Sequence, residues 1–126
     1  MVNKFRIYDK LNKEYCEEPD YRWLLSRQGK LYNSENDEWH IDGARYVIEF
    51  STGIFDNNYV EIYDGDILKG ITDNEFAEKK ESNYEVMKGR DSWHIKGTFF
   101  SIQELFNYCN NKVSVIGNKH HKKFTP

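Results

Sequence analysis

The chain has 126 residues, a mass of 15.1 kDa and a net charge of −3, which fits a single domain that buries one core. Its mean hydropathy is −0.87, but aromatic residues make up 16% of it, and this excludes an intrinsically disordered chain. No apolar run approaches the roughly 20 residues of a membrane span, and residues 1–6 lack the apolar segment of a signal peptide, so we expect a soluble cytoplasmic protein.

Alternation of apolar and polar residues predicts an all-β chain. The first strands are expected at residues 4–8, 14–16, 29–33 and 39–41. Residues 21–27 fit either a helical turn or a buried strand. Residues 44–51 and 59–63 are expected to pair as a hairpin, because the Asp and Asn residues at positions 56–58 tolerate the positive φ of its turn.

The second half of the chain is expected to continue in the same way. Further strands are predicted at residues 67–69, 84–88, 92–96 and 113–116, with a tight turn at residues 64–66. The charged run at residues 72–82 is interpreted as an exposed loop with at most one helical turn.

One helix is predicted at residues 102–110. Ser101 and Glu104 have the spacing of a capping box, in which each side chain bonds the other's backbone amide. Four residues recur at i, i+3, i+4 and i+7 and form one apolar stripe: Ile102, Leu105, Phe106 and Cys109. A helix this short is unstable alone in water, so it must pack on the sheet.

The two cysteines, Cys16 and Cys109, are far apart and belong to no C-x-x-C motif. Without an export signal they are expected to be reduced thiols. Cys109 lies on the apolar stripe of the helix, which predicts a thiol packed in the core.

No metal site, cofactor or catalytic centre is predicted. A calcium-loop register that starts at Asp64 fails, because Leu68 and Lys69 stand where an oxygen ligand and a glycine are needed. The histidines and cysteines lack the paired spacing of a zinc site. The chain has no nucleophile elbow, phosphate-binding loop or dinucleotide fingerprint, so it is expected not to be an enzyme.

Nucleic-acid binding stays open as an alternative, because small β-barrels can stack bases on aromatic side chains beside lysines that contact phosphate. The candidate contacts are Tyr59, Tyr63, Lys119, Lys122 and Lys123, with Trp39 and Trp93 as further stacking residues. The three lysines lie in a C-terminal segment without acidic residues, which is also interpreted as a solvated tail. The rest of the chain is therefore more acidic than the total charge, which argues against a general polyanion binder.

Three segments carry a recognisable pattern: K-F-R-I-Y-D-K at residues 4–10, S-T-G-I-F-D-N-N-Y-V-E-I-Y-D-G-D-I at residues 51–67 and V-I-G-N at residues 115–118. Together they resemble the YopX family of bacteriophage and prophage proteins. That family carries a K-F-R strand, a T-G-x-x-D hairpin that leads into I-Y-E-G-D, and a closing V-I-G-N. Asp64 stands where Glu is common, and the basic tail stands where the family usually has an acidic ending that contains proline.

The resemblance implies a small SH3-like barrel, a tendency to form homo-oligomers and no established catalytic residues. We expect residues 1–44 to form N-terminal strands and an arm that packs on the barrel or on a neighbouring subunit. Residues 45–118 are expected to form the barrel with its helix, and residues 119–126 a basic tail. An exposed strand edge on the arm would favour assembly by β-pairing between subunits.

The expected partners are a second copy of the chain and a host or phage protein, in the cytoplasm of an infected or lysogenic bacterium, with no cofactor and no membrane. The residues that match the family pattern are interpreted first as folding signals, with glycines for turn geometry, aspartates that cap turn amides and isoleucines for the core. They are Phe5, Arg6, Gly53, Asp56, Ile62, Tyr63, Gly65, Asp66, Ile116, Gly117 and Asn118.

Overall fold

The structure is a computed structural model, and it describes residues 4–16, 23–26, 30–33, 37–41, 44–74, 77–89 and 92–120. These residues form antiparallel strands and one short helix, so the all-β prediction is confirmed. The chain divides into two compact units, Met1–Phe50 and Ser51–Pro126. The division lies within strand β6 (Tyr46–Phe55), whereas the sequence placed the start of the barrel at residue 45.

The first unit contains a sheet built around β1 (Phe5–Asp9). β1 pairs on one side with the short strand β2 (Glu14–Tyr15) and on the other with the first half of β6. Ile7 and Ile48 lie opposite each other in this pairing and are both buried. The alternation of the K-F-R-I-Y segment thus places one face of β1 in a core, as the sequence predicted.

A second sheet of this unit has the order β3-β4-β5, from β3 (Trp23–Leu25), β4 (Lys30–Asn33) and β5 (Glu38–Ile41). The segment that fitted either a helical turn or a strand therefore contains a strand. The core of the unit consists of Ile7, Leu31, Tyr46 and Ile48, with Phe5, Cys16, Leu25 and Phe50 packed against it.

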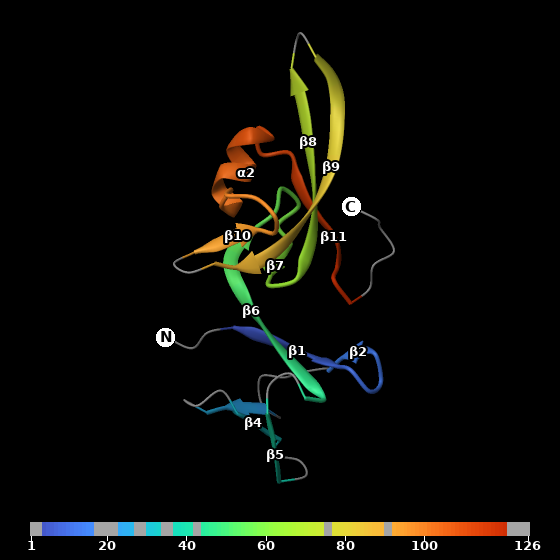
Figure 1. Ribbon diagram of the computed structural model, residues 1–126, viewed down its shortest axis with the longest axis vertical. Helices are drawn as coiled ribbons and strands as arrows, with labels where there is room; N and C mark the ends of the chain where they lie inside the picture. Colours follow the sequence, from blue (N-terminus) through green and yellow to red (C-terminus); the bar gives the residue numbers. More distant parts are fainter. Residues whose placement is uncertain are drawn as a thin grey trace. The chain divides into compact units, whose positions relative to one another are not determined.

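The second unit contains the curled sheet of a half-barrel, which agrees with the small barrel that the resemblance implied (Figure 1). Its four antiparallel strands, in the order β10-β9-β8-β11, are β8 (Asp66–Asn74), β9 (Ala77–Lys88), β10 (Trp93–Ile95) and β11 (Val113–Asn118). The second half of β6 pairs with β7 (Glu61–Tyr63). The fully enclosed core residues are Ile62, Leu68, Val86, Ile95, Ile102, Leu105, Cys109 and Val113.

The predicted loop at residues 72–82 is wrong. β8 and β9 form a long two-stranded ribbon, in which Ile71 pairs with Glu81 and Thr72 with Lys80 (Figure 1). Lys79 and Glu81 are both exposed, and their charged groups lie 3.9 Å apart. Because solvent reaches such a ribbon, its residues have no need to alternate between apolar and polar, and the strand signal is absent from the sequence.

The helix α2 (Ile102–Tyr108) begins and ends close to the predicted positions. Its capping box is confirmed: the Ser101 hydroxyl accepts from the Glu104 amide at 3.1 Å, and the Glu104 carboxylate accepts from the Ser101 amide at 3.3 Å. Ile102, Leu105 and Cys109 are buried in the core of the second unit, so the apolar stripe packs on the sheet as predicted.

Two strand ends differ from the prediction. Tyr59 and Val60 belong to the turn rather than to β7, because Tyr59 adopts a left-handed φ of 62°. β11 continues through Gly117 and Asn118, beyond the predicted end of the strand at residue 116. A bulge between Val115 and Gly117 shifts the register, and the strand then pairs on with β8.

Candidate functional site

The T-G-x-x-D pattern forms a bulge in β6. Gly53 has a φ of 76°, a left-handed conformation that glycine adopts without strain. The register between β6 and β7 is irregular at this point, where the Thr52 hydroxyl donates to the carbonyl of Ile62 at 2.8 Å and accepts from the Ile54 amide at 3.1 Å. This part of the motif therefore shapes a strand.

The Asp56 carboxylate organises the turn that follows. One of its oxygens accepts from the amides of Asn58 and Val60, and the other accepts from the amide of Val115 on β11, each at 2.8 Å. Asp56 is 5% exposed. Its bonds connect two segments far apart in the sequence, which a local turn motif could not predict.

The I-Y-D-G-D segment forms the turn from β7 to β8. Gly65 has a φ of 85°, and the buried Asp66 carboxylate accepts from the Tyr63 amide at 2.7 Å. Ile62 is buried in the core, whereas Ile116 is only half-buried. These residues therefore fold the chain, and Asp66 is not exposed to a ligand.

The N-terminal motif also lies in a packed region. Phe5 packs edge to face against Phe50, with ring centroids 6.2 Å apart. Nε of Arg6 lies 2.8 Å from the carboxylate of Glu49, whose side chain is fully buried. The matched residues of the first unit thus contribute a ring contact and an ion pair.

The candidate nucleic-acid contacts are spread over several segments. Tyr59 is 89% exposed in the turn before β7, whereas Tyr63 is half-buried at the other end of that strand. Lys119 is half-buried, and its amide donates to the carbonyl of Gly65 at 2.7 Å. Lys122 and Lys123 lie outside the described residues. Of the two further stacking candidates, Trp93 is half-buried against the core and Trp39 is 60% exposed.

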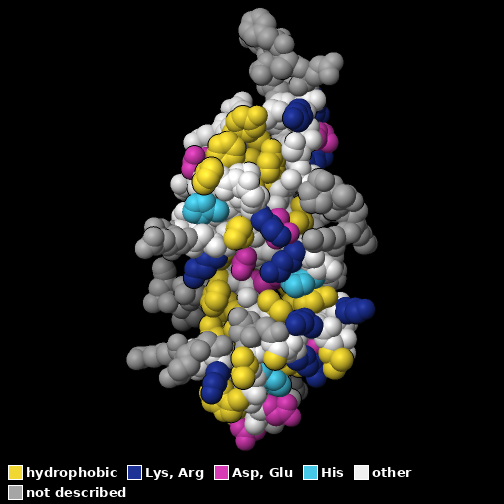
Figure 2. Space-filling view, in the orientation of Figure 1, with side chains coloured by type: hydrophobic (Ala, Val, Ile, Leu, Met, Phe, Trp, Pro, Cys, Tyr) yellow, Lys and Arg dark blue, Asp and Glu magenta, His cyan; other side chains and the backbone are white. Residues whose placement is uncertain are grey.

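Trp39 belongs to an exposed apolar surface of the first unit. It lies on β5, an edge strand of the sheet β3-β4-β5, together with Ile41, which is 67% exposed. Tyr32 pairs with Trp39 across β4 and β5, and the two ring centroids are 5.0 Å apart. We call these three side chains the outer face of the sheet, and Figure 2 shows apolar groups over β4 and β5 in its view.

Alternation alone would have placed this face in the core. The intervening residue, His40, instead turns toward the buried side, where its ring packs against Tyr46 with centroids 4.8 Å apart. Its cross-strand partner Leu31 is fully buried. The sequence shows only that Trp39 and Ile41, two residues apart, share one face of a strand, and an apolar face is ordinarily the buried one.

The buried carboxylates of the described residues already have structural partners. Asp9 is held by Arg45, whose hydrogen bonds keep the pKa of that carboxyl below its ordinary value. Burial raises the pKa values of the Cys16 and Cys109 thiols, which opposes thiolate formation. The part of the chain that the structure describes contains no group of three or more metal-ligating side chains. It also contains no helix long and apolar enough to cross a membrane.

Residues 4–122 match the family described as YopX protein. The chain belongs to the YopX family. This confirms the resemblance drawn from the three segments, and the match covers nearly the whole chain. No curated protein matches the chain.

This YopX-family protein also resembles a solved structure. The crystal structure of protein EF1440 from Enterococcus faecalis is 24% identical in sequence, and the match covers 95% of this chain and 94% of that one. The TM-score is 0.58. At this identity the likeness shows that the two proteins share a fold.

Proposed function

We propose that this YopX-family protein is a non-enzymatic β module that associates with a second copy of itself through strand β5. The observation that carries the proposal is the exposure of Trp39 and Ile41, 60% and 67%, side by side on an edge strand. An edge strand presents unpaired backbone groups, and large apolar side chains on its face favour covering by another protein. This surface lies in the segment expected to form the assembling arm.

The pattern of β5 suits pairing with itself. Consider two copies of β5 that pair antiparallel about a two-fold axis, with their outer faces on the same side of the joined sheet. Odd-numbered residues of one copy then lie opposite odd-numbered residues of the other, and even-numbered opposite even-numbered. One such register places Trp39 opposite Ile41 of the second copy, and the next places Trp39 opposite Trp39, with Glu38 opposite His40. Both registers bring apolar side chains together. The first also places Glu38 opposite Asp42, two like charges, so the second register, in which Glu38 faces His40, is favoured.

Sedimentation velocity of the full chain over a range of concentrations tests this proposal. We expect the wild type to form a dimer at micromolar concentrations and the Trp39→Lys and Ile41→Lys variants to stay monomeric, because a lysine on the edge strand opposes β-pairing. Phe99→Lys is the matched control, since Phe99 is 99% exposed but lies in the second unit.

A wild type that stays monomeric at high concentration would overturn the proposal. A Phe99→Lys variant that dissociates as readily as Trp39→Lys would show that loss of the dimer is not specific to β5, and this would also overturn the proposal. Circular dichroism spectra establish that each variant is folded before its mass is compared.

The remaining parts of the proposal are a bacteriophage or prophage origin, a location in the cytoplasm of the bacterial host, and an additional host or phage protein as partner. The family assignment supports the origin.

The non-enzymatic role is supported by the buried carboxylates, since those of Asp9, Glu49, Asp56 and Asp66 each accept hydrogen bonds within the fold. Fractionation of a lysogenic strand, with recovery of the tagged chain from the membrane or the medium, would contradict the location.

Nucleic-acid binding is the second candidate, and the exposure of Tyr59 favours it. Fluorescence anisotropy with labelled single- and double-stranded oligonucleotides tests it at low and moderate salt. Phosphate contacts would weaken steeply with salt, and replacing Lys119, Lys122 and Lys123 by alanine would remove them. No binding at low salt would reject this candidate and leave the dimer proposal unaffected.

A further inference from the structure

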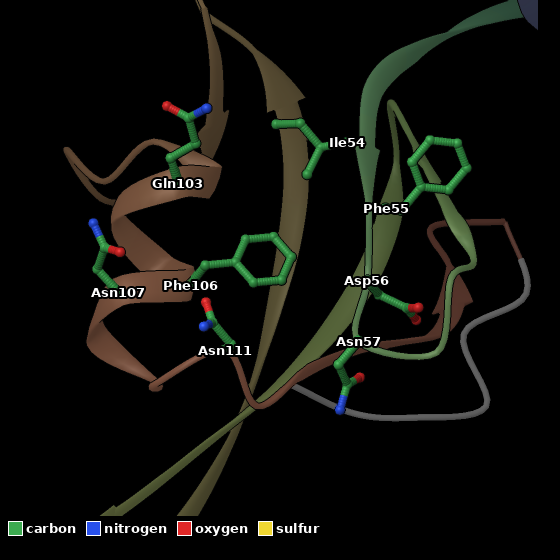
Figure 3. A pocket seen from close by; sticks show the side chains of 8 residues that line it. All are labelled: Ile54, Phe55, Asp56, Asn57, Gln103, Phe106, Asn107 and Asn111. Carbon is green, nitrogen blue, oxygen red and sulfur yellow. The ribbon is translucent and has the colours of Figure 1, made fainter.

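A groove of about 510 Å³ lies in the second unit, between α2 and the turn that follows β6. One wall comes from the end of β6 and its turn, and the other comes from α2 and from Asn111 beyond the C-terminal end of the helix (Figure 3). Phe106 points from the helix toward the strands, with Ile54 across from it, and both pack against the core of the unit. The inner part of the groove is therefore apolar and continuous with the core of the unit.

The rest of the groove's lining, on both walls, is rich in amide side chains. Four exposed amides line it: Asn57, Gln103, Asn107 and Asn111. Asn111 has a left-handed φ of 64°, and its backbone N–H donates to the carbonyl of Phe106 at 2.7 Å, which fixes its position beside the helix. Each amide side chain offers both a donor and an acceptor, which is the same pair that a peptide unit presents.

The groove offers no charge to a ligand. Its single ionisable residue is Asp56, whose carboxylate already accepts three backbone amides and is 5% exposed. A phosphate, a carboxylate or a basic side chain would therefore gain no ion pair there. The lining matches an uncharged ligand that both donates and accepts hydrogen bonds.

The spacing along α2 matches an extended polypeptide. Gln103 and Asn107 are four residues apart on the helix, which separates them by about 6 Å along its axis. Peptide units that face the same way in an extended chain repeat about every 6.6–6.8 Å. The two amides can thus pair with successive outward-facing peptide units of one strand, while alternate side chains of that strand point toward Phe106 and Ile54.

We propose that this groove binds an extended, uncharged segment of a partner protein, with apolar side chains at alternate positions. The amides hold its backbone, and Phe106 and Ile54 receive its apolar side chains. This site lies in the other unit from β5, so it does not rest on the proposed self-association.

The experiment uses the immobilised full chain to select from a displayed library of random twelve-residue peptides. Enriched sequences are synthesised with a fluorophore, and their affinity is measured by anisotropy. We expect neutral peptides with alternating apolar residues and an affinity that changes little with salt. The double variant Gln103→Ala/Asn107→Ala should bind them about tenfold more weakly, because it loses two pairs of hydrogen bonds. Alanine favours the helix, so this variant should remain folded.

Asn58→Ala is the matched control, since Asn58 is an exposed amide of the neighbouring turn that does not line the groove. Its affinity for the peptides should equal that of the wild type. In two-dimensional NMR spectra, the side-chain amide signals of Gln103 and Asn107 should shift on peptide addition. Failure to enrich any sequence, strongly charged sequences, or equal binding by the double variant would each overturn the proposal.

Discussion

Arg6 and Glu49 lie opposite each other on β1 and β6, and Nε of Arg6 donates to the Glu49 carboxylate at 2.8 Å. The Glu49 side chain is fully buried, and the same oxygen accepts from the Tyr15 hydroxyl at 2.8 Å. The Arg6 guanidinium also lies over the Tyr15 ring, 4.7 Å from its centre. The conspicuous K-F-R motif therefore supplies the cation that compensates a buried acid.

The Arg6→Met variant should lose about 3 kcal/mol of unfolding free energy, because it leaves the buried Glu49 carboxylate without its cation. Urea unfolding at neutral pH measures the loss. Lys88→Met removes an exposed cation from β9 and should change stability by less than about 0.5 kcal/mol. Similar small losses in both variants would show that Arg6 is not needed to compensate Glu49.

Asp56→Ala should destabilise the protein by about 3 kcal/mol or more, because three backbone amides lose a charged acceptor. The variant should also lose the hydrogen bond between the Asp56 carboxylate and the Val115 amide on β11, so hydrogen exchange at that amide should accelerate. Asn57→Ala, at the exposed neighbouring position, serves as the control for stability. Protection of Val115 that survives the loss of Asp56 would contradict this role.

Gly70→Ala should cost about 1–3 kcal/mol through overpacking. A methyl group at Gly70 would meet the Cys109 sulfur at 2.7 Å and the Tyr84 ring at 3.0 Å. The double variant Gly70→Ala/Cys109→Ala removes the closer clash. Its loss of unfolding free energy should therefore be smaller than the sum of the losses in the two single variants. Thermal unfolding of the four proteins of this cycle measures the coupling, and strict additivity would contradict the close approach of β8 and α2.

The pH dependence of stability should include a contribution from Asp9. Its hydrogen bonds with Arg45, at 2.9 and 3.0 Å, lower the pKa of the Asp9 carboxyl from its ordinary value of 3.8. A lowered pKa stabilises the folded state above the ordinary value, and this contribution is lost as the pH falls through the folded pKa. Asp9→Asn should therefore be less stable than the wild type at neutral pH, with a gap that narrows below about pH 4.

Urea unfolding at several pH values checks this expectation. Asp37→Asn is a suitable control, because Asp37 is an exposed carboxylate in the same unit. A gap between Asp9→Asn and the wild type that stays constant down to low pH would show that the Asp9 charge does not contribute through this pair.

Short-range features were predictable from the sequence because their causes lie within a few residues. The capping box of Ser101 and Glu104 and the turn at Asp56 depend on neighbouring amides. The three family segments likewise identified the YopX family without structural information. Most strands were found because apolar and polar residues alternate wherever one face of a strand is buried.

The tertiary structure decided what depends on distant partners. The charged residues of the β8–β9 ribbon show no alternation, and only their cross-strand pairing reveals two long strands. The exposed face of β5 could not be read from the sequence. His40 lies on the inner side because it is paired with the buried Leu31 and packs against Tyr46, and Trp39 therefore lies on the outer side. The groove lined by amide side chains likewise forms only because the turn after β6 lies beside α2 in the folded chain. The sequence determined the family and the local elements, whereas long-range packing determined which surfaces remain to bind a partner.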